Sequence, residues 1–119
     1  MHVNRGDVIL AFVANVGQPG GKVRPAVVVV QSDHNSARLH ETIIAAITSN
    51  TSRVHEATQL LIDIATPDGA ASGLLHNSAV RGERLHAIAQ AEVRRVISHL
   101  SAALLLKVND YLKAALELP

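Results

Sequence analysis

Short apolar runs separated by turn residues occupy the first three quarters of the chain. Four runs predict strands, because they are short, rich in β-branched residues and bounded by Gly, Pro or polar residues: 8–13, 26–30, 42–48 and 59–64. Shorter runs at 78–80 and 84–88 can complete a sheet. Between the runs, 15–21 is a loop rich in Gly and Pro, 31–41 is a polar connection, and Thr-Pro-Asp-Gly at 66–69 predicts a turn.

The last part of the chain has a helical period instead. After Ser101, a suitable N-cap, apolar residues recur at spacings of three and four and form one stripe: Leu105, Val108, Leu112, Ala115 and Leu116. This pattern predicts an amphipathic helix of about four to five turns that covers an open side of the sheet. The stretch 91–100 is expected to add a short helix before it. Residues 1–119 contain no internal repeat or linker, so we expect a single α+β domain, a small barrel of short strands with a C-terminal helix.

Composition excludes several classes of function. The chain has 119 residues, no Cys, a net charge of +1 and only two aromatic residues, Phe12 and Tyr111. Disulfides, thiolate zinc sites and a cysteine nucleophile are therefore excluded, and binding by stacked aromatic platforms is nearly excluded. No apolar run approaches the ~20 residues that span a bilayer, and the N-terminus lacks the pattern of a signal peptide. We expect a cytoplasmic protein without membrane contact, whose nucleic-acid contacts, if any, come from a local patch.

Two features suggest a phosphate-binding loop and a metal site, but the sequence supports neither. The glycine-rich loop 17–21 contains a proline and precedes a strand, whereas a phosphate-binding loop needs a helix N-terminus after its glycines. It is either a plain surface loop or a loop that moves over a binding groove. Among seven histidines, only His34 and His40, beside Asp33 and Glu41, resemble metal ligands. No second element joins them, so ordinary surface histidines are the better interpretation, and we expect no metal or cofactor.

Arg24 and Thr48 are the more informative pair. Arg24 stands at the start of the second predicted strand and Thr48 at the end of the third. If these strands are antiparallel neighbours, the guanidinium and the hydroxyl share one rim of the sheet, beside the glycine-rich loop and Ser49-Asn50. From the pattern alone, they also suit an ordinary strand-end arginine and a turn threonine.

Three motifs in order give these residues a context. RGDVI at 5–9, RPAVVV at 24–29 and IIAAITS at 43–49 resemble the MazF/PemK family of toxin endoribonucleases, as do GLL at 73–75, Ser78, Val80 and the final helix. The resemblance covers nearly the whole chain. It implies an SH3-like β-barrel of the CcdB/PemK type, a homodimer, and metal-independent cleavage of single-stranded RNA such as mRNA. It also implies a separately encoded, MazE-like antitoxin with an acidic disordered segment.

The resemblance also implies a mechanism and assigns residues to it. The 2′-hydroxyl of the RNA attacks the adjacent phosphorus and leaves a 2′,3′-cyclic phosphate and a 5′-hydroxyl, with Arg24 and Thr48 as the matching catalytic residues. Arg is a poor general base, and a histidine such as His34 or His76 would be a better one if it reached the groove, so the base stays unassigned. Candidate RNA contacts are the basic and polar residues around the predicted strand ends: Gln18, Lys22, Ser49, Asn50, Arg53, Ser78 and Arg81.

This chain departs from the family pattern at three places, and two alternatives remain. Leu10-Ala11-Phe12 replaces a common tryptophan, Ser98 replaces a glycine, and Gly82-Glu83 replaces Asp-Gln or Asn-Gln, which affects base selectivity. One alternative is a non-catalytic, CcdB-like toxin that binds DNA gyrase. Such toxins depend on a C-terminal tryptophan, and this chain contains no tryptophan. The other is a barrel that has lost RNase activity and only binds a partner.

Overall fold

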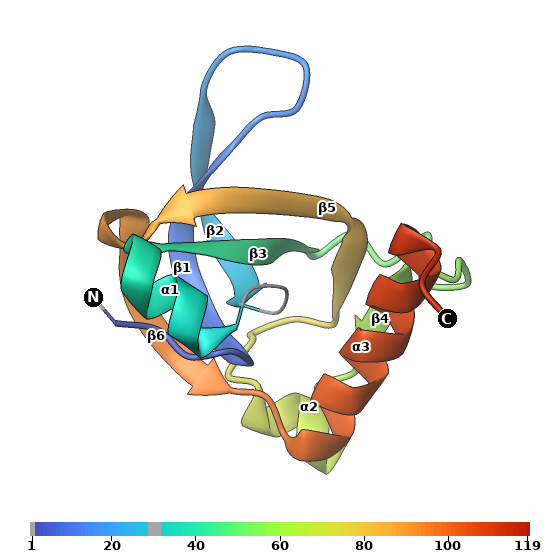
Figure 1. Ribbon diagram of the computed structural model, residues 1–119. Helices are drawn as coiled ribbons and strands as arrows, with labels where there is room; N and C mark the ends of the chain where they lie inside the picture. Colours follow the sequence, from blue (N-terminus) through green and yellow to red (C-terminus); the bar gives the residue numbers. More distant parts are fainter. Residues whose placement is uncertain (1, 29–31) are drawn as a thin grey trace.

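The computed structural model describes residues 2–28 and 32–119, and these form a curled sheet with helices around it (Figure 1). In chain order the elements are β1 (Asp7–Ala14), β2 (Gly21–Val28), α1 (Asp33–Leu39), β3 (Glu41–Thr48), β4 (Gln59–Ile62), α2 (Pro67–Ala71), β5 (Ser78–Ala89), the 3-10 turn η1 (Gln90–Glu92), β6 (Val93–His99) and α3 (Ala102–Leu116). The end of the second predicted strand, 29–30, and residue 31 of the predicted connection lie outside the described residues.

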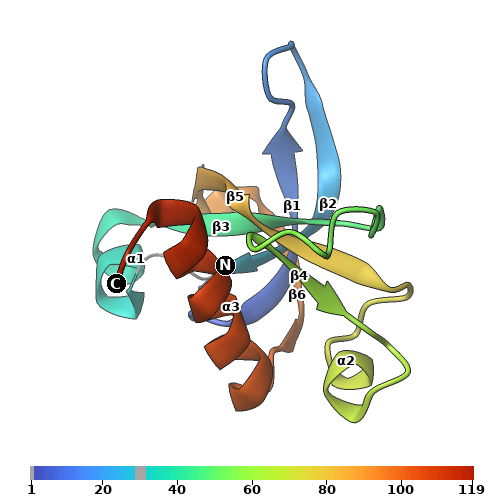
Figure 2. The same cartoon turned by 90° about the vertical axis from the view of Figure 1, so that its right-hand side faces the viewer.

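The sheet confirms the predicted α+β class. Its six strands follow the order β4-β5-β3-β2-β1-β6, and every neighbouring pair is antiparallel. The edge strands β4 and β6 do not pair with each other, so the barrel is open. The β1–β2 hairpin extends well beyond the rest of the sheet, and α3 runs along the opposite side of the molecule (Figures 1 and 2).

Two short predicted runs belong to one long strand. β5 covers both of them, and its pairing with β3 shifts register between Ala46, which pairs with Arg81, and Ala45, which pairs with Leu85. Residues 82–84 therefore bulge out of the ladder. A bulge bends the strand and re-aims its side chains, which explains why the sequence pattern breaks in two here.

Three local predictions were wrong. The stretch 91–100 consists mainly of strand β6, which follows the end of η1, rather than of a helix, because β1 has a free edge and pairs with β6. The connection 31–41 contains α1, whose N-cap Ser32 accepts a hydrogen bond from the Asn35 N–H. The predicted turn at 66–69 begins α2, where Thr66 caps the Gly69 N–H and Pro67 occupies the first turn.

The C-terminal helix is confirmed, with its buried stripe rotated from the predicted one. Ser101 caps the helix by accepting the Leu104 N–H at 3.2 Å. The buried residues are Leu104, Val108 and Leu112, while Leu116 is exposed. Among residues 2–28 and 32–119, no helix combines the length and the apolar character that a bilayer crossing requires.

Two apolar cores lie on opposite faces of the central strands. The first includes Val27 of β2 and Ala45 of β3, and it packs against α3. The second includes Ala26 and Ile44, the neighbours of those residues, together with side chains of β1 and β6. Because side chains alternate along a strand, β2 and β3 are packed on both faces.

Candidate active site

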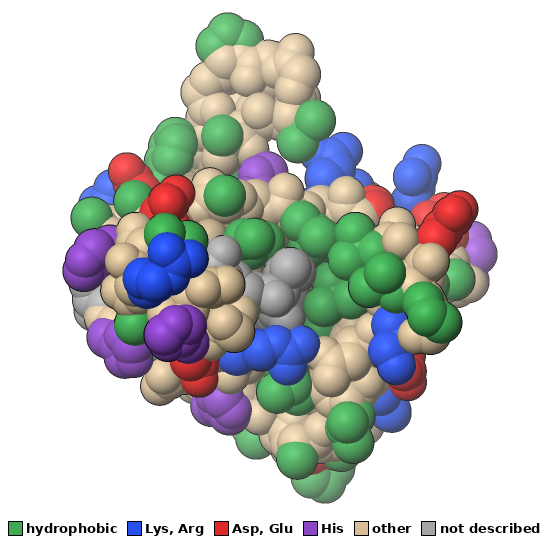
Figure 3. Space-filling model, viewed as in Figure 1, with side chains coloured by type: hydrophobic (Ala, Val, Ile, Leu, Met, Phe, Trp, Pro, Cys, Tyr) green, Lys and Arg blue, Asp and Glu red, His purple; other side chains and the backbone are tan. Residues whose placement is uncertain are grey.

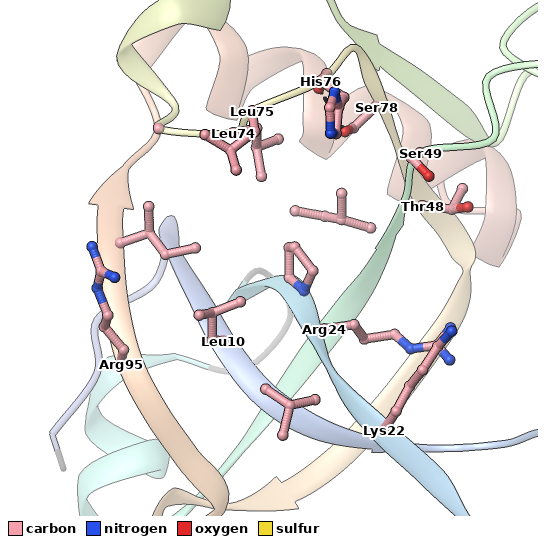
Figure 4. Close-up of a pocket in the computed structure, with 15 residues that line it drawn as sticks. Leu10, Lys22, Arg24, Thr48, Ser49, Leu74, Leu75, His76, Ser78 and Arg95 are labelled. Carbon is pink, nitrogen blue, oxygen red and sulfur yellow. Dashed lines mark hydrogen bonds between the residues drawn. The ribbon is translucent and has the colours of Figure 1, made fainter.

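A cleft of about 580 Å³ opens at one end of β2 and β3. Its walls come from β1, β2, the end of β3 and β6, and the segment 73–76 closes its far side. The lining is mostly apolar, and Leu75 in that segment is 84% exposed. Arg95 from β6 stands on the opposite side of the opening from Lys22 and Arg24 (Figure 4). We call this opening the central cleft.

Arg24, inside β2, lies level with Thr48, the last residue of the adjacent strand β3. Strands β2 and β3 are antiparallel, with Ala26 opposite Ala46, and this register continued by two residues aligns Arg24 with Thr48. Both residues line the central cleft. Each is two residues away from the paired alanine on its own strand, so both side chains fall on the same face of the sheet as those alanines. Figure 4 shows Arg24 and Lys22 extending from β2 on the side of Thr48, away from Leu10.

The Thr48 hydroxyl is oriented by the chain that follows it. Its oxygen accepts a hydrogen bond from the Asn50 N–H at 3.1 Å, and the Asn50 side chain in turn accepts the Ser52 N–H at 3.1 Å. A hydroxyl has one proton to donate and two lone pairs. With one lone pair occupied, the Thr48 proton is left to donate to a bound group at the rim of the cleft.

The guanidinium of Arg24 is not neutralised by the described residues. Its Nε is buried and has no hydrogen-bond partner. The ion pairs found in residues 2–28 and 32–119 involve Arg53, Arg81 and His99, and none involves Arg24. Buried polar atoms are normally satisfied, so an arginine in this state is prepared for an anion.

A histidine missed by sequence reasoning belongs to the same surroundings. The pKa of His86 on β5 is lowered from 6.5 by its burial, and further by the positive charges of Arg84 and Arg24. His86 pairs with Ile44 on β3. His86 follows the bulge at 82–84, which no sequence motif signals.

The other predicted contact residues divide into two groups. Lys22, Ser49 and Ser78 line the central cleft with Arg24 and Thr48. The remainder lie outside its lining: Gln18 in the β1–β2 loop, Asn50 directly after the cleft residue Ser49, Arg53 in the β3–β4 loop, and Arg81 on β5.

Two of these arginines already have acidic partners. Arg53 is exposed and lies 3.9 Å from Glu56. Arg81 lies 3.5 Å from Glu83, whose carboxylate also accepts from the Gln59 amide at 2.8 Å and the Thr58 hydroxyl at 3.2 Å. The Glu83 carboxylate is thus held by three neighbours.

The two histidines considered as a base are placed differently. His76 lines the central cleft, and its backbone carbonyl accepts the Ser78 hydroxyl. His34 is exposed on α1, which does not contribute to the cleft. In the part of the chain that the structure describes, no three His, Asp or Glu side chains gather closely enough to hold a metal ion.

Positive charge is local on the face of the molecule that Figure 3 shows. Figure 3 shows Lys and Arg side chains in several separate places, with an apolar area between them, rather than one continuous basic face. This distribution agrees with the net charge of +1. Binding of a polyanion therefore depends on a few well-placed cations rather than on a general field.

Comparison with known proteins gives one consistent result. Residues 4–116 match the family described as PemK-like, MazF-like toxin of type II toxin-antitoxin system. The chain is 31% identical to Endoribonuclease EndoA of Bacillus subtilis (strain 168), over 99% of this chain and 97% of the relative.

Solved structures share the fold. An endoribonuclease in complex with its cognate antitoxin from a mycobacterial species superposes with a TM-score of 0.75 at 19% identity, over 98% of this chain and 97% of that one. A MazE-MazF structure (Form-III) from Deinococcus radiodurans gives a TM-score of 0.74 at 13% identity, over 100% of both chains.

Proposed function

Because this chain belongs to the PemK-like, MazF-like family of toxins of type II toxin–antitoxin systems, we propose that it cleaves single-stranded RNA at the rim of its central cleft, with Arg24 and Thr48 as catalytic residues. The chain is an endoribonuclease toxin. The assignment of its activity to these two side chains is the part that requires testing.

The proposed reaction uses a nucleophile that the substrate carries. The RNA 2′-oxygen forms a bond to the adjacent phosphorus while the bond from phosphorus to the 5′-oxygen breaks. The 2′-hydroxyl loses its proton and the departing 5′-oxygen gains one, so the products carry a 2′,3′-cyclic phosphate and a 5′-hydroxyl. The protein has to hold the phosphodiester in line and stabilise the charge on its oxygens.

Arg24 and Thr48 suit this task. A planar guanidinium can donate two parallel hydrogen bonds to phosphoryl oxygens, and it keeps its charge at every physiological pH. The Thr48 hydroxyl donates a further hydrogen bond from the adjacent strand. The observation that carries the proposal is the unneutralised Arg24 guanidinium, level with a hydroxyl whose oxygen accepts the Asn50 N–H and whose proton has no acceptor among the described residues.

Further contacts and partners follow from the same site. Lys22, Ser49 and Ser78 contact the RNA within the cleft, while Gln18, Asn50, Arg53 and Arg81 extend the contacts beyond it. The protein acts as a homodimer, which doubles this set of contacts, and a cognate antitoxin with an acidic segment competes for the cations. Both the RNA substrate and the toxin are cytoplasmic.

The experiment incubates purified protein with single-stranded RNA in EDTA and identifies the ends of the products. Wild-type protein is expected to leave 5′-hydroxyl ends, and Arg24→Ala and Thr48→Ala to lose cleavage. Lys107→Ala, on the exposed side of α3, is the control and keeps full cleavage. Equal cleavage by the Arg24 or Thr48 variant would refute the assignment. The family match does not favour a CcdB-like gyrase binder, and cleavage by the wild type would exclude a barrel without RNase activity.

A further inference from the structure

One side of the central cleft is not used by the proposed reaction. The segment 73–76 lines the cleft there, and Figure 4 shows Leu75 and His76 on this side, with Ser78 next to His76. Leu75 and His76 are both exposed. The described part of the chain offers the His76 ring no hydrogen-bond or ion-pair partner, and the Ser78 hydroxyl bonds to the backbone carbonyl of His76 instead. We call the segment 73–76 the far wall, and its exposed side chains are available to a ligand.

The far wall is fixed to the fold on both sides. Before it, the Ser98 hydroxyl of β6 donates to the Ser72 carbonyl at 2.5 Å, and the buried Ser72 hydroxyl accepts the Leu74 N–H at 3.3 Å. After it, the Asn77 side chain accepts the N–H of Ile64 at 2.9 Å. A ligand therefore meets a backbone that is already held in place, so little conformational entropy is lost when it binds.

Strand pairing places the far wall beside the end of β3. Thr48 pairs with Ala79 at the start of β5, and the same antiparallel register continued by one residue places Ser49 level with Ser78. The Ser78 hydroxyl donates to the His76 carbonyl at 2.8 Å, so His76 is tied to the residue that stands at this level. The pairing of β3 with β5 thus brings the far wall next to the two residues that carry the Thr48 and Ser49 hydroxyls.

The chemistry of the far wall suits a nucleobase better than a phosphate. No Lys or Arg occurs between residues 73 and 78, so the wall carries no permanent positive charge of its own. Leu74 and Leu75 offer apolar surface to the flat face of a base. A neutral imidazole has one donor and one acceptor, and the exposed Ser49 hydroxyl has one donor and two lone pairs. Proteins recognise the unpaired bases of single-stranded RNA by such a combination of packing on the faces and hydrogen bonds along the edges.

We propose that the far wall holds the base next to the cleaved phosphodiester, and that the His76 imidazole hydrogen-bonds to the edge of this base and so contributes to the sequence preference of cleavage. The inference rests on the proposed function, because it takes the ligand to be an RNA strand that Arg24 and Thr48 cleave. His76 is a specificity-determining residue in this scheme. It transfers no proton and touches none of the reacting atoms.

The test compares wild-type protein with His76→Ala on a pool of single-stranded RNAs of random sequence. Sequencing of the cut ends gives the relative kcat/KM for each base at every position around the cut. In His76→Ala, the preference at one position next to the cut should shrink by roughly two- to tenfold, the range expected for one lost hydrogen bond, while the other positions keep theirs. His34→Ala, exposed on α1, should keep the whole wild-type profile. Each profile is a ratio within one sample, so a smaller folded fraction does not change it.

A second measurement follows binding without cleavage. The ligand is a single-stranded oligonucleotide of mixed sequence in which every 2′-hydroxyl is replaced by hydrogen, so that it lacks the nucleophile and stays intact. In wild-type protein, the ring proton signals of His76, assigned by their loss in His76→Ala, should shift as this oligonucleotide is added. The ring signals of His34 should stay where they are, because α1 does not contribute to the central cleft.

The outcomes separate this inference from the proposed function. An unchanged base profile in His76→Ala, or an equal loss of rate for all four bases, would overturn the inference even if the wild-type protein cleaves RNA. A shift of the His76 signals without cleavage of any RNA would keep the far wall as a base-binding surface and reject the proposed active site. His76 signals that change with protein concentration and not with the oligonucleotide would overturn the inference and assign the far wall to a contact between copies of the chain.

Discussion

Replacing Thr48 by valine removes one hydroxyl and keeps the shape of the side chain. The structure predicts two separate effects, because this oxygen accepts the Asn50 N–H at 3.1 Å and its proton is available to the substrate phosphate. Loss of one preorganised donor to a reacting oxyanion lowers kcat by on the order of 10²–10³-fold, or about 3–4 kcal/mol. The effect on folding is small, since Asn50 is exposed and water can replace the lost acceptor, at a cost below about 1 kcal/mol.

The assay compares Thr48→Val with Thr48→Ser under single-turnover conditions, with thermal unfolding measured on both. Thr48→Ser keeps the hydroxyl and is expected to cleave within about tenfold of the wild type. Thr48→Val is expected to bind a single-stranded oligonucleotide without 2′-hydroxyls, which cannot be cleaved, almost as tightly as the wild type does. It is expected to cleave the matching RNA strand very slowly. A valine variant whose single-turnover rate stays within a few-fold of the wild type would show that the hydroxyl does not contact the reacting phosphate.

Three further changes test the fold around the site. Gly69→Ala should destabilise the protein by about 1–3 kcal/mol or more in urea unfolding, because a Cβ there would lie 1.8 Å from the Asp63 carbonyl oxygen; an unchanged midpoint would contradict this packing. Asp7→Ala should lower the free energy of unfolding in urea by about 1–3 kcal/mol, because the buried carboxylate accepts the Asn4 N–H at 2.8 Å. Asp7→Asn should lower it less, because the asparagine side chain keeps an acceptor. The free energy of unfolding should fall as the pH drops below 6.5, because the unfolded chain binds a proton at His86 that the folded chain accepts only at lower pH. In His86→Gln, the free energy of unfolding should fall less steeply with decreasing pH. An equally steep fall in this variant would show that other groups cause the pH dependence.

The fold was predictable wherever an element depends on its own residues. The runs that became β1, β3 and β4 are short, apolar and β-branched, and the final helix carries a cap and a helical period. β6 was not predictable, because Val93–His99 becomes a strand only by pairing with the free edge of β1. α1 and α2 depend on Ser32 and Thr66 as caps of very short helices, a signal that polar turns share.

The candidate site divides in the same way. Thr48 ends β3 and Arg24 lies inside β2, which begins earlier than predicted, but the antiparallel register of these two strands was enough to predict that the residues are level with each other. The charges of Arg84 and Arg24 lower the pKa of His86, which follows a bulge in β5, and that bulge depends on contacts between segments far apart in the chain. Sequence reasoning named His76 and His34 as better bases if either reached the groove, and it had no means to single out His86.

The presence of an apolar core on each side of β2 and β3 bears on how such a toxin can be silenced. Val27 and Ala45 hold these strands from the side of α3, while Ala26 and Ile44 hold them from the other side. The spacing between Arg24 and Thr48 is therefore built into the folded chain and does not await the arrival of RNA. If Arg24 and Thr48 cleave RNA as proposed, a blocking molecule gains little by bending these strands, and occupying the central cleft is the direct way to stop cleavage.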